Sequence, residues 1–506
     1  MTSPARDRDF RLVWAGTAAS RLGTSVASVA TPLVALTELD AGPLVVTSLT
    51  AATWLPWLLV GLPAGAWVDR LAKRPVMVVC DVVSALAVLS VPLAVWAGVL
   101  TVAHLLLAAL GLGTAAVLFT TAWTSYLPAV LEPDELVPAN ALLHGSESAA
   151  QVAGPGLAGA LAGALGAAAG LVVQAAAFGA SALCLLLVRR PERRPAAAGE
   201  RDLRREVAEG VRFVARDPLL RRLVLHGAVS NFALTGYSAL LVVLLVRDVG
   251  LAEGTVGLVL TLSALGGVAG AAAAQPLVRR LGSARTLVRC KAGAGPWALL
   301  VPLTTGPSTL WLLVLGSTAV VAGVVAGNVV SGSFRQRYVP AGLLGRVTTS
   351  MQFVNLGTIP LGALTAGVLA TALGTRTAVW LLVVAYALSG LLLVLGPLRG
   401  RRDLPEAALV QPGPGQRAAQ VSPPDSTVTR LSSASPSSRP DRPPATSSTP
   451  RLPVETSTAG SAARTSASVD PRPTPSGVRR SRPSPPCSVQ PTNVPSSTST
   501  EKPSTA

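Results

Sequence analysis

The chain is 506 residues long; half of these residues are hydrophobic and only 13% are charged. Together with a mean hydropathy of +0.51, this composition excludes an ordinary soluble protein and indicates a chain that crosses a membrane many times. The net charge of +17 does not indicate nucleic-acid binding, because the arginines lie between apolar runs and in the C-terminal region, without interleaved aromatic residues.

Apolar runs follow one another along most of the chain. A bilayer core of about 30 Å requires about 20 apolar residues in a helix, and the runs of this chain predict twelve such helices. In chain order they lie at 12–37, 46–68, 76–98, 102–125, 140–165, 168–188, 222–246, 254–276, 287–305, 309–332, 346–372 and 376–398. The fold class predicted is therefore an all-α membrane protein with twelve transmembrane helices.

The basic residues alternate between successive loops. Clusters lie at the N-terminus and near 70–74, 189–222, 279–289, 335–346 and 399–402, whereas the loops near 40, 99, 167, 306 and 374 carry almost none. By the positive-inside rule, this alternation places both termini in the cytoplasm. The first apolar run is too long for a cleavable signal. We expect a multi-pass protein of the cell membrane that contacts lipid and is monomeric.

Cysteine and lysine positions argue against metal, disulfide and nucleotide chemistry. Cys80, Cys184, Cys290 and Cys487 are scattered without a Cys-x-x-Cys pair, which supports neither a zinc site nor a disulfide framework. None of the lysines, Lys73, Lys291 and Lys502, follows a glycine, so a phosphate-binding Gly-Lys-Ser/Thr loop is excluded. We therefore expect no cofactor, no metal and no enzymatic activity, and any transport should be driven by gradients.

The two halves of the chain repeat one another. Asp69-Arg70-Leu71, Cys80-Asp81 and Ser20-Arg21 recur at one offset as Arg279-Arg280-Leu281, Cys290-Lys291 and Ser230-Asn231. Tyr126-Leu-Pro-Ala recurs as Tyr338-Val-Pro-Ala, and Pro155 has a counterpart in Pro360. These matches predict two pseudo-symmetric six-helix bundles, at 1–188 and 222–398, with a substrate site between them.

The linker and the C-terminal region have different compositions. Residues 189–221 should form a cytoplasmic linker in which 202–220 is an amphipathic helix, with Leu203, Val207, Val211 and Val214 at helical spacing. From Arg399 to residue 506, the composition is rich in Pro, Ser, Thr and Arg and lacks long apolar runs. This composition predicts a disordered tail.

The turn between the second and third predicted helices is the most distinctive motif. Gly65, Asp69, Arg70, Lys73 and Arg74 resemble the Gly-x-x-x-Asp-Arg-x-Gly-Arg-Arg loop of the major facilitator superfamily, although Ala72 replaces its second glycine. Gly61 and Gly65 should allow close helix packing. The resemblance implies that these charged residues form a conformational gate and that Asp69 holds the outward-facing state.

Other segments resemble one branch of that superfamily, which contains the enterobactin exporter and macrolide efflux proteins. The similar segments are Glu209 to Arg221, Leu127-Pro-Ala-Val-Leu, and Glu135 to Leu142. Gly154, Pro155, Gly156 and Gly159 resemble the Gly-Pro motif of antiporters in the fifth helix. The arginine usual in the fourth helix of drug-proton antiporters is missing from 102–125. The resemblance therefore implies export and leaves the coupling mechanism open.

Ionisable and polar residues inside the predicted helices are candidates for function, because such groups are costly in a membrane. His144, Glu147, Gln151 and Pro155 share one helix face. Glu147 is the first candidate for proton coupling, and its alternative is a gate residue paired with an arginine. Asp81 is the second, with a gate partner of Arg70 or Arg74 as its alternative. Candidates for the substrate cavity are Arg21, His144, Gln151, Asn231, Gln352 and Asn355. The fixed positive charge of Arg21 could either bind an anionic group of the substrate or lower the pKa of a nearby carboxyl.

From these features we predict a secondary transporter. It should export a small, largely apolar organic compound, such as a drug, an antibiotic or a siderophore-like metabolite, by proton antiport, because few acids line the predicted cavity. Two alternatives remain open from the sequence: proton-coupled uptake, and a transport-inactive membrane sensor or scaffold that signals through the tail.

Overall fold

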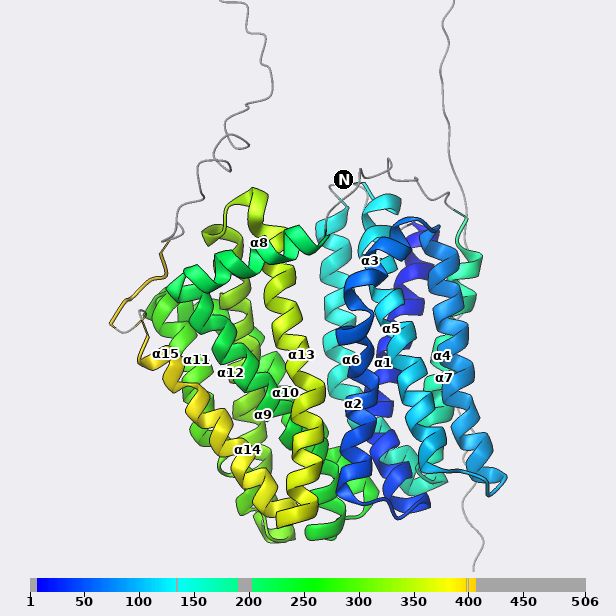
Figure 1. Cartoon of the computed structure of the whole chain (residues 1–506). Helices are drawn as coiled ribbons and strands as arrows, with labels where there is room; N and C mark the ends of the chain where they lie inside the picture. The colour runs from blue at the N-terminus through cyan, green and yellow to red at the C-terminus, as the bar shows by residue number, and fades with distance from the viewer. Residues whose placement is uncertain (1–6, 133–134, 190–202, 397, 399, 406–506) are drawn as a thin grey trace, which may run out of the picture. The chain divides into compact units, whose positions relative to one another are not determined.

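The computed structural model describes residues 7–132, 135–189, 203–396, 398 and 400–405, and this part of the chain contains helices and no strand (Figure 1). A first helix set comprises α1 (Arg8–Glu38), α2 (Pro43–Leu59), α3 (Gly61–Asp69), α4 (Lys73–Trp96), α5 (Val102–Val130), α6 (Leu136–Leu165) and α7 (Ala168–Leu187). A linker helix, α8 (Leu203–Arg216), follows. The second helix set comprises α9 (Pro218–Val243), the π-helix η2 (Leu244–Asp248), α10 (Glu253–Leu281), α11 (Ser283–Ala298), the 3₁₀ turns η3 (Val301–Leu303) and η4 (Pro307–Thr309), α12 (Leu310–Tyr338), α13 (Ala341–Leu373), α14 (Thr375–Ser389) and α15 (Leu391–Val394).

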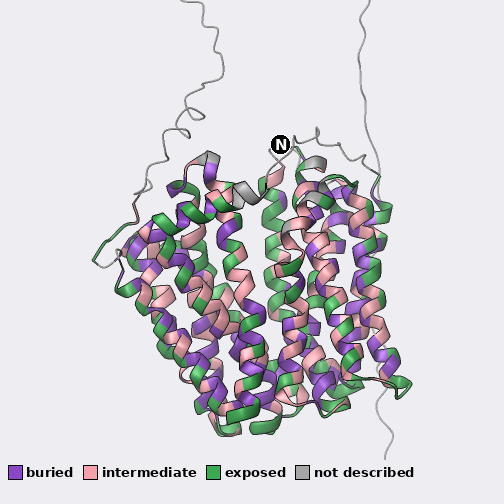
Figure 2. Cartoon of the chain, in the orientation of Figure 1, coloured by how far each residue is buried: buried purple, intermediate pink, exposed green. Residues whose placement is uncertain are grey.

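In the part of the chain that the structure describes, eight helices are long and apolar enough to cross a membrane: α4, α5, α7, α9 with η2, α10, α12, α13 and α14 with α15. α2 is apolar but shorter. Each of the twelve predicted runs falls on a helix or on consecutive helices. Exposed positions alternate with buried ones along the helices (Figure 2), and large apolar side chains such as Leu59, Trp96, Leu107 and Leu186 are exposed. Such an apolar outer surface suits lipid rather than water.

Helix pairing in the second set repeats that in the first. α1 packs on α6 and α7 as α9 packs on α13 and α14, and α2 packs on α5 as α10 packs on α12. The equivalent helices α6 and α13 both end at a glycine with a positive φ, Gly166 (88°) and Gly374 (86°). Such a backbone conformation favours glycine, so the same residue type ends the same helix in both sets.

The helices end at two opposite faces of the protein, which we call the α8 face and the Asp40 face. The α8 face is the end with the N-terminus of α1, the turn between α3 and α4, and α8. The Asp40 face is the opposite end, with the turn between α1 and α2 at Asp40 and the turns at Gly166, Gly250 and Gly374.

The helix sets contact one another through α6 with α10 and α2 with α13. A Cβ added to Gly159 would lie 2.7 Å from the Cα of Gly257, near the Asp40 face. Close to the same face, Arg247 forms an ion pair with Asp40 at 2.5 Å. The tightest contacts between the sets therefore lie toward the Asp40 face.

The linker helix α8 packs against the start of α13. Phe213 and Val214 are buried, and Gly210 lies against Ser350 and the backbone of Arg346. Val211, which we expected on the apolar face, is 44% exposed. The helix therefore rests on protein through the Gly210 and Phe213 side. The side chains of Leu203 and Val207, and residues 190–202, lie outside the described part.

The first residues of the range predicted as a tail lie against the start of α11. Asp403 accepts hydrogen bonds from the Ser283 backbone N–H at 2.9 Å and hydroxyl at 3.2 Å, and the N–H donation lowers the pKa of this exposed carboxyl. The Ala284 N–H donates to the Arg402 carbonyl at 3.0 Å. Residues 400–405 thus supply acceptors to unpaired N–H groups of the helix start, and 406–506 lie outside the described residues.

A buried carboxylate fixes the start of α9. Asp217, which is fully buried, accepts hydrogen bonds from the Leu219 and Leu220 N–H groups at 2.9 Å and from the Tyr338 hydroxyl at 2.7 Å. Because the Tyr338 bond goes to a buried acid, Tyr338→Phe should lower the free energy of unfolding by about 1.5–3 kcal/mol. Thermal unfolding of the purified chain in detergent measures this change. An unchanged unfolding midpoint would contradict it.

Candidate functional site

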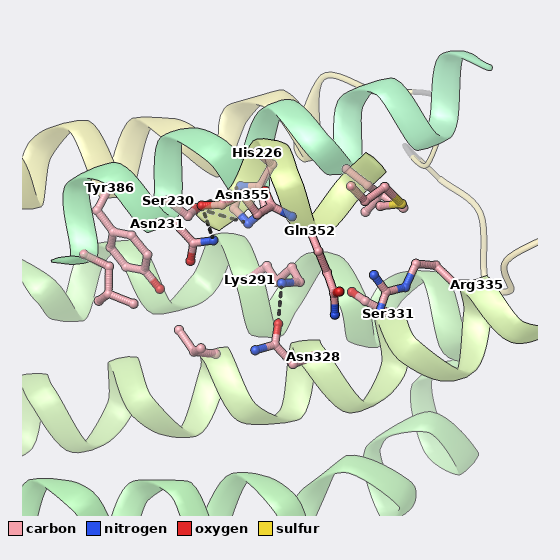
Figure 3. A pocket seen from close by; sticks show the side chains of 15 residues that line it. His226, Ser230, Asn231, Lys291, Asn328, Ser331, Arg335, Gln352, Asn355 and Tyr386 are labelled. Atoms are coloured by element: carbon pink, nitrogen blue, oxygen red, sulfur yellow. Dashed lines mark hydrogen bonds between the residues drawn. The ribbon is translucent and has the colours of Figure 1, made fainter. Parts of the chain in front are cut away.

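A cavity of about 350 Å³ lies within the second helix set, between α9, α11, α12, α13 and α14 (Figure 3). Its described polar lining residues are His226, Ser230, Asn231, Lys291, Asn328, Ser331, Arg335, Gln352, Asn355 and Tyr386, and its larger apolar ones are Leu223, Leu234, Val324 and Met351. Three predicted cavity residues, Asn231, Gln352 and Asn355, are therefore brought together.

The cavity lies toward the α8 face. Of its α9 residues, Asn231 is 13 positions after Pro218, which places it about 20 Å along the helix from that end. Arg335 is three residues before α12 ends at Tyr338, and Gln352 is in the first half of α13. The cavity and the tight contacts near Gly159 thus lie toward opposite ends of the helices.

Lys291 is held in this cavity by two residues of α12. Its Nζ donates a hydrogen bond to Asn328 Oδ1 at 3.0 Å. A Cβ on the neighbouring Gly327 would lie 2.7 Å from the Lys291 Cγ, so the missing side chain there provides the space through which the lysine stem runs. Within the described residues, the ammonium group forms no ion pair.

Arg335 supplies a second positive charge. Its positive charge repels that of the Lys291 ammonium. The Arg335 guanidinium has neither an ion pair nor a hydrogen bond in the part of the chain that the structure describes. Figure 3 shows Arg335 with Ser331 at one end of the cavity and Tyr386 at the other. None of the described lining residues is an acid.

Amide and hydroxyl groups form the remaining polar lining. Asn231 Nδ2 donates to the backbone carbonyl of Asn355 at 3.4 Å. A Cβ on Gly227 would lie 2.6 Å from Asn355 Oδ1, so this glycine makes room for the asparagine. Asn355 Oδ1 and Ser331 Oγ are buried without a hydrogen-bond partner among the described residues, and a bound compound could supply one.

His226 is a buried lining residue of the cavity and forms no ion pair among the described residues. Its Nδ1 lies 3.1 Å from the Ser389 carbonyl, and Ser230 Oγ lies 2.8 Å from Ser389 Oγ. These bonds tie α9 to α14. His226, Lys291 and Arg335 were not predicted as cavity residues. The sequence did contain a signal for Lys291, because it stands in the repeat at the position of Asp81, which was a functional candidate.

The first helix set holds a separate charged cluster. Arg21 of α1 lies 3.5 Å from Glu147 Oε1, and His144 Nδ1 lies 3.5 Å from Glu147 Oε2. The Arg21 and Glu147 side chains are 46% and 33% exposed. Gln151, predicted on the same face, is exposed. None of these four residues lines the cavity of the second set.

Asp81, the second candidate for proton coupling, is buried between α4 and α7. It is 2% exposed and has one oxygen, Oδ2, without a hydrogen-bond partner in the described residues. Arg74, one of its expected partners, donates instead to the Leu185 and Leu186 carbonyls at 2.7 and 2.6 Å.

In the turn between α3 and α4, the bases bond to backbone carbonyls. Lys73 is 2% exposed and donates to the Val68 and Leu71 carbonyls at 2.7 and 3.0 Å, whereas Arg70 is exposed. The side chain of Asp69 lies outside the described part. Gly61 and Gly65 have open space where a Cβ would stand, so the close packing that we expected at these glycines is not found in this conformation.

The Gly-Pro segment of α6 does pack closely. A Cβ on Gly154 would collide with Ser25 of α1, one on Gly156 would lie 2.8 Å from Thr261 Oγ1 of α10, and Gly159 adjoins Gly257. The segment with Pro155 therefore lies where α6 contacts both α1 and the second helix set. Its small residues are needed for that approach.

Comparison with known proteins identifies the family. The model of the Major Facilitator Superfamily matches residues 13–359. The multidrug efflux pump Tap of Mycolicibacterium fortuitum is 29% identical over 396 residues, which cover 76% of this chain and 94% of Tap. The uncharacterized MFS-type transporter y4rN of Sinorhizobium fredii is 29% identical over 380 residues, covering 72% and 88%.

Solved structures show the same fold. A bacterial homologue of the iron transporter ferroportin, in an inward-facing state, superposes with a TM-score of 0.64 and 17% identity, over 78% of this chain and 99% of that one.

Proposed function

Because the chain belongs to the Major Facilitator Superfamily, whose members are transporters, we propose that it exports a small, largely apolar organic compound in exchange for protons. The proposal includes twelve membrane spans in two six-helix halves, both termini in the cytoplasm and a monomer in the plasma membrane. On this topology the α8 face is cytoplasmic, and the conformation described here is closed on the outer side.

The contact between Arg21 and Glu147 carries the proposal. Glu147 is a carboxyl group on a membrane helix, 3.5 Å from a fixed positive charge. A carboxylate can form an ion pair with Arg21, whereas a protonated carboxyl cannot. Breaking and making this contact, as the helices move, would therefore accompany proton uptake and release. Groups of this kind inside membrane helices commonly belong to proton pathways.

Two observations support export of an organic compound rather than of a metal ion. The relative Tap is a multidrug efflux pump. The cavity of about 350 Å³ falls in the range of small-molecule sites, and its lining combines amide, hydroxyl, apolar and cationic groups without a described acid. Divalent cations bind instead to carboxylates and similar oxygen ligands.

The test is dye efflux from cells that express the chain. Cells loaded with neutral, cationic and anionic fluorescent dyes should lose at least one class faster than control cells, and an uncoupler should remove the difference. Uncoupler-sensitive accumulation would indicate uptake instead. If neither efflux nor accumulation differed from that in control cells, the export proposal would fail and the sensor or scaffold alternative would gain support.

A further inference from the structure

We propose that the cavity of the second helix set is a binding site for the anionic group of an amphipathic organic acid, a carboxylate or sulfonate attached to an apolar body. Lys291 and Arg335 would bind the anionic group, and the region toward Tyr386 would bind the apolar body. This inference rests on the proposed export function, since it names the class of compound that the transporter carries.

The two helix sets differ in how their positive charges are balanced. In the first helix set, the positive charge of Arg21 is matched by Glu147 at 3.5 Å. In the second set, Lys291 and Arg335 act on one another, and neither forms an ion pair among the described residues. Unmatched positive charges within membrane helices are costly. An anion bound between them would supply the missing negative charge.

Neighbouring residues position Lys291 and leave hydrogen-bonding groups beside both cations. Gly327 leaves the space occupied by the stem of Lys291, and Asn328 accepts one of its three N–H bonds at 3.0 Å, which leaves the others for a ligand. Figure 3 shows Gln352 and Ser331 between Lys291 and Arg335. Ser331 Oγ is buried without a partner among the described residues, so its hydroxyl could donate to an anion.

The end of the cavity away from Arg335 offers apolar surface. Val324 precedes Asn328 by one helical turn on α12, away from the α8 face, and Leu234 follows Asn231 on α9 in the same direction. Tyr386 lies at the end opposite Arg335 (Figure 3). Leu234, Val324 and Tyr386 thus provide apolar and aromatic surface deeper in the protein than Arg335, on which the apolar body of a molecule with one charged end could pack.

A matched pair of probes tests the proposal: 2-naphthoate and 2-naphthamide, which share a ring system and differ in charge. We expect the purified full-length chain in detergent to bind 2-naphthoate about tenfold or more tightly than the amide, because the carboxylate forms charge-assisted bonds. Isothermal titration calorimetry measures both affinities. Equal affinities, or binding of neither compound, would overturn the proposal without any variant.

Variants test whether Lys291 and Arg335 cause the preference for 2-naphthoate. Lys291→Gln and Arg335→Gln should each reduce it, and the double variant should remove it. The matched control is Arg337→Gln, because Arg337 is exposed, lies on the same helix and does not line the cavity. A preference that survives in the double variant would overturn the assignment. Dye export without a carboxylate preference would contradict this inference alone, whereas a preference without export would contradict the proposed function alone.

Discussion

Glu147→Gln should abolish export against a concentration gradient while leaving substrate binding intact. Glutamine retains the size of glutamate and can still hydrogen-bond, but it cannot take up or release a proton. It also cannot form the ion pair that Glu147 makes with Arg21 at 3.5 Å. The variant should therefore still exchange substrate down a gradient, because that process requires no proton.

The measurement uses proteoliposomes with and without an imposed pH difference. Accumulation driven by the pH difference should fall to the background level in Glu147→Gln. The matched control is Glu38→Gln, an exposed acid near the end of α1 toward the Asp40 face, which should accumulate substrate as the parent does. If Glu147→Gln retained pH-driven accumulation, Glu147 would not be the coupling residue, and the buried Asp81 would be the next acid to test.

Gly257→Leu should also stop transport, for a steric reason. A Cβ at Gly257 would lie 2.5 Å from the Pro155 carbonyl oxygen and 2.7 Å from the Gly159 Cα. These are backbone atoms, which cannot rotate aside as a side chain can. The contact between α6 and α10 near the Asp40 face could then form only if the helices moved apart. Even modest overpacking costs about 1–3 kcal/mol, which shifts a two-state equilibrium about 5- to 150-fold.

Cross-linking reports this shift directly. Cysteines placed at Gly163 and Gly254 of a chain without native cysteines should form a disulfide in the parent, because a Cβ on Gly163 would lie 3.9 Å from the Gly254 nitrogen. Gly257→Leu should reduce that cross-link and the rate of export together. Gly293→Leu is the control, since Gly293 has open space around its Cβ position. Unchanged cross-linking and export in Gly257→Leu would show that this contact does not take part in closure.

Hydrophobic runs predicted the positions of the helices well but not their ends. The tenth run was predicted to end at residue 332, whereas α12 continues to Tyr338. Arg335 was therefore interpreted as a loop charge, although it lies in the helix and lines the cavity. Hydropathy marks where apolar residues stop, and a helix that continues beyond that point carries its polar residues into the protein.

Contacts between distant residues were predicted where a shared helix face or a repeat pointed to them. The polar face of α6 indicated Glu147, for which an arginine partner was one of the alternatives, and in the structure Arg21 lies 3.5 Å from it. The glycines were harder to interpret. Gly61 and Gly65 have open surroundings, whereas Gly159 and Gly257 meet between the helix sets. Which glycines meet depends on how the helices are arranged, and one sequence does not contain that information.

Outward substrate movement and inward proton movement should occur in the same transport cycle. Proteoliposomes that contain the purified chain and an internal pH-sensitive dye test it most directly, when a transported compound found by the efflux screen is added on one side. If protons move opposite to the compound, its movement into the vesicles should raise the internal pH, its movement out of them should lower the internal pH, and an imposed pH difference should drive its accumulation. Movement of the compound with no change in internal pH, and no response to the imposed difference, would contradict proton antiport.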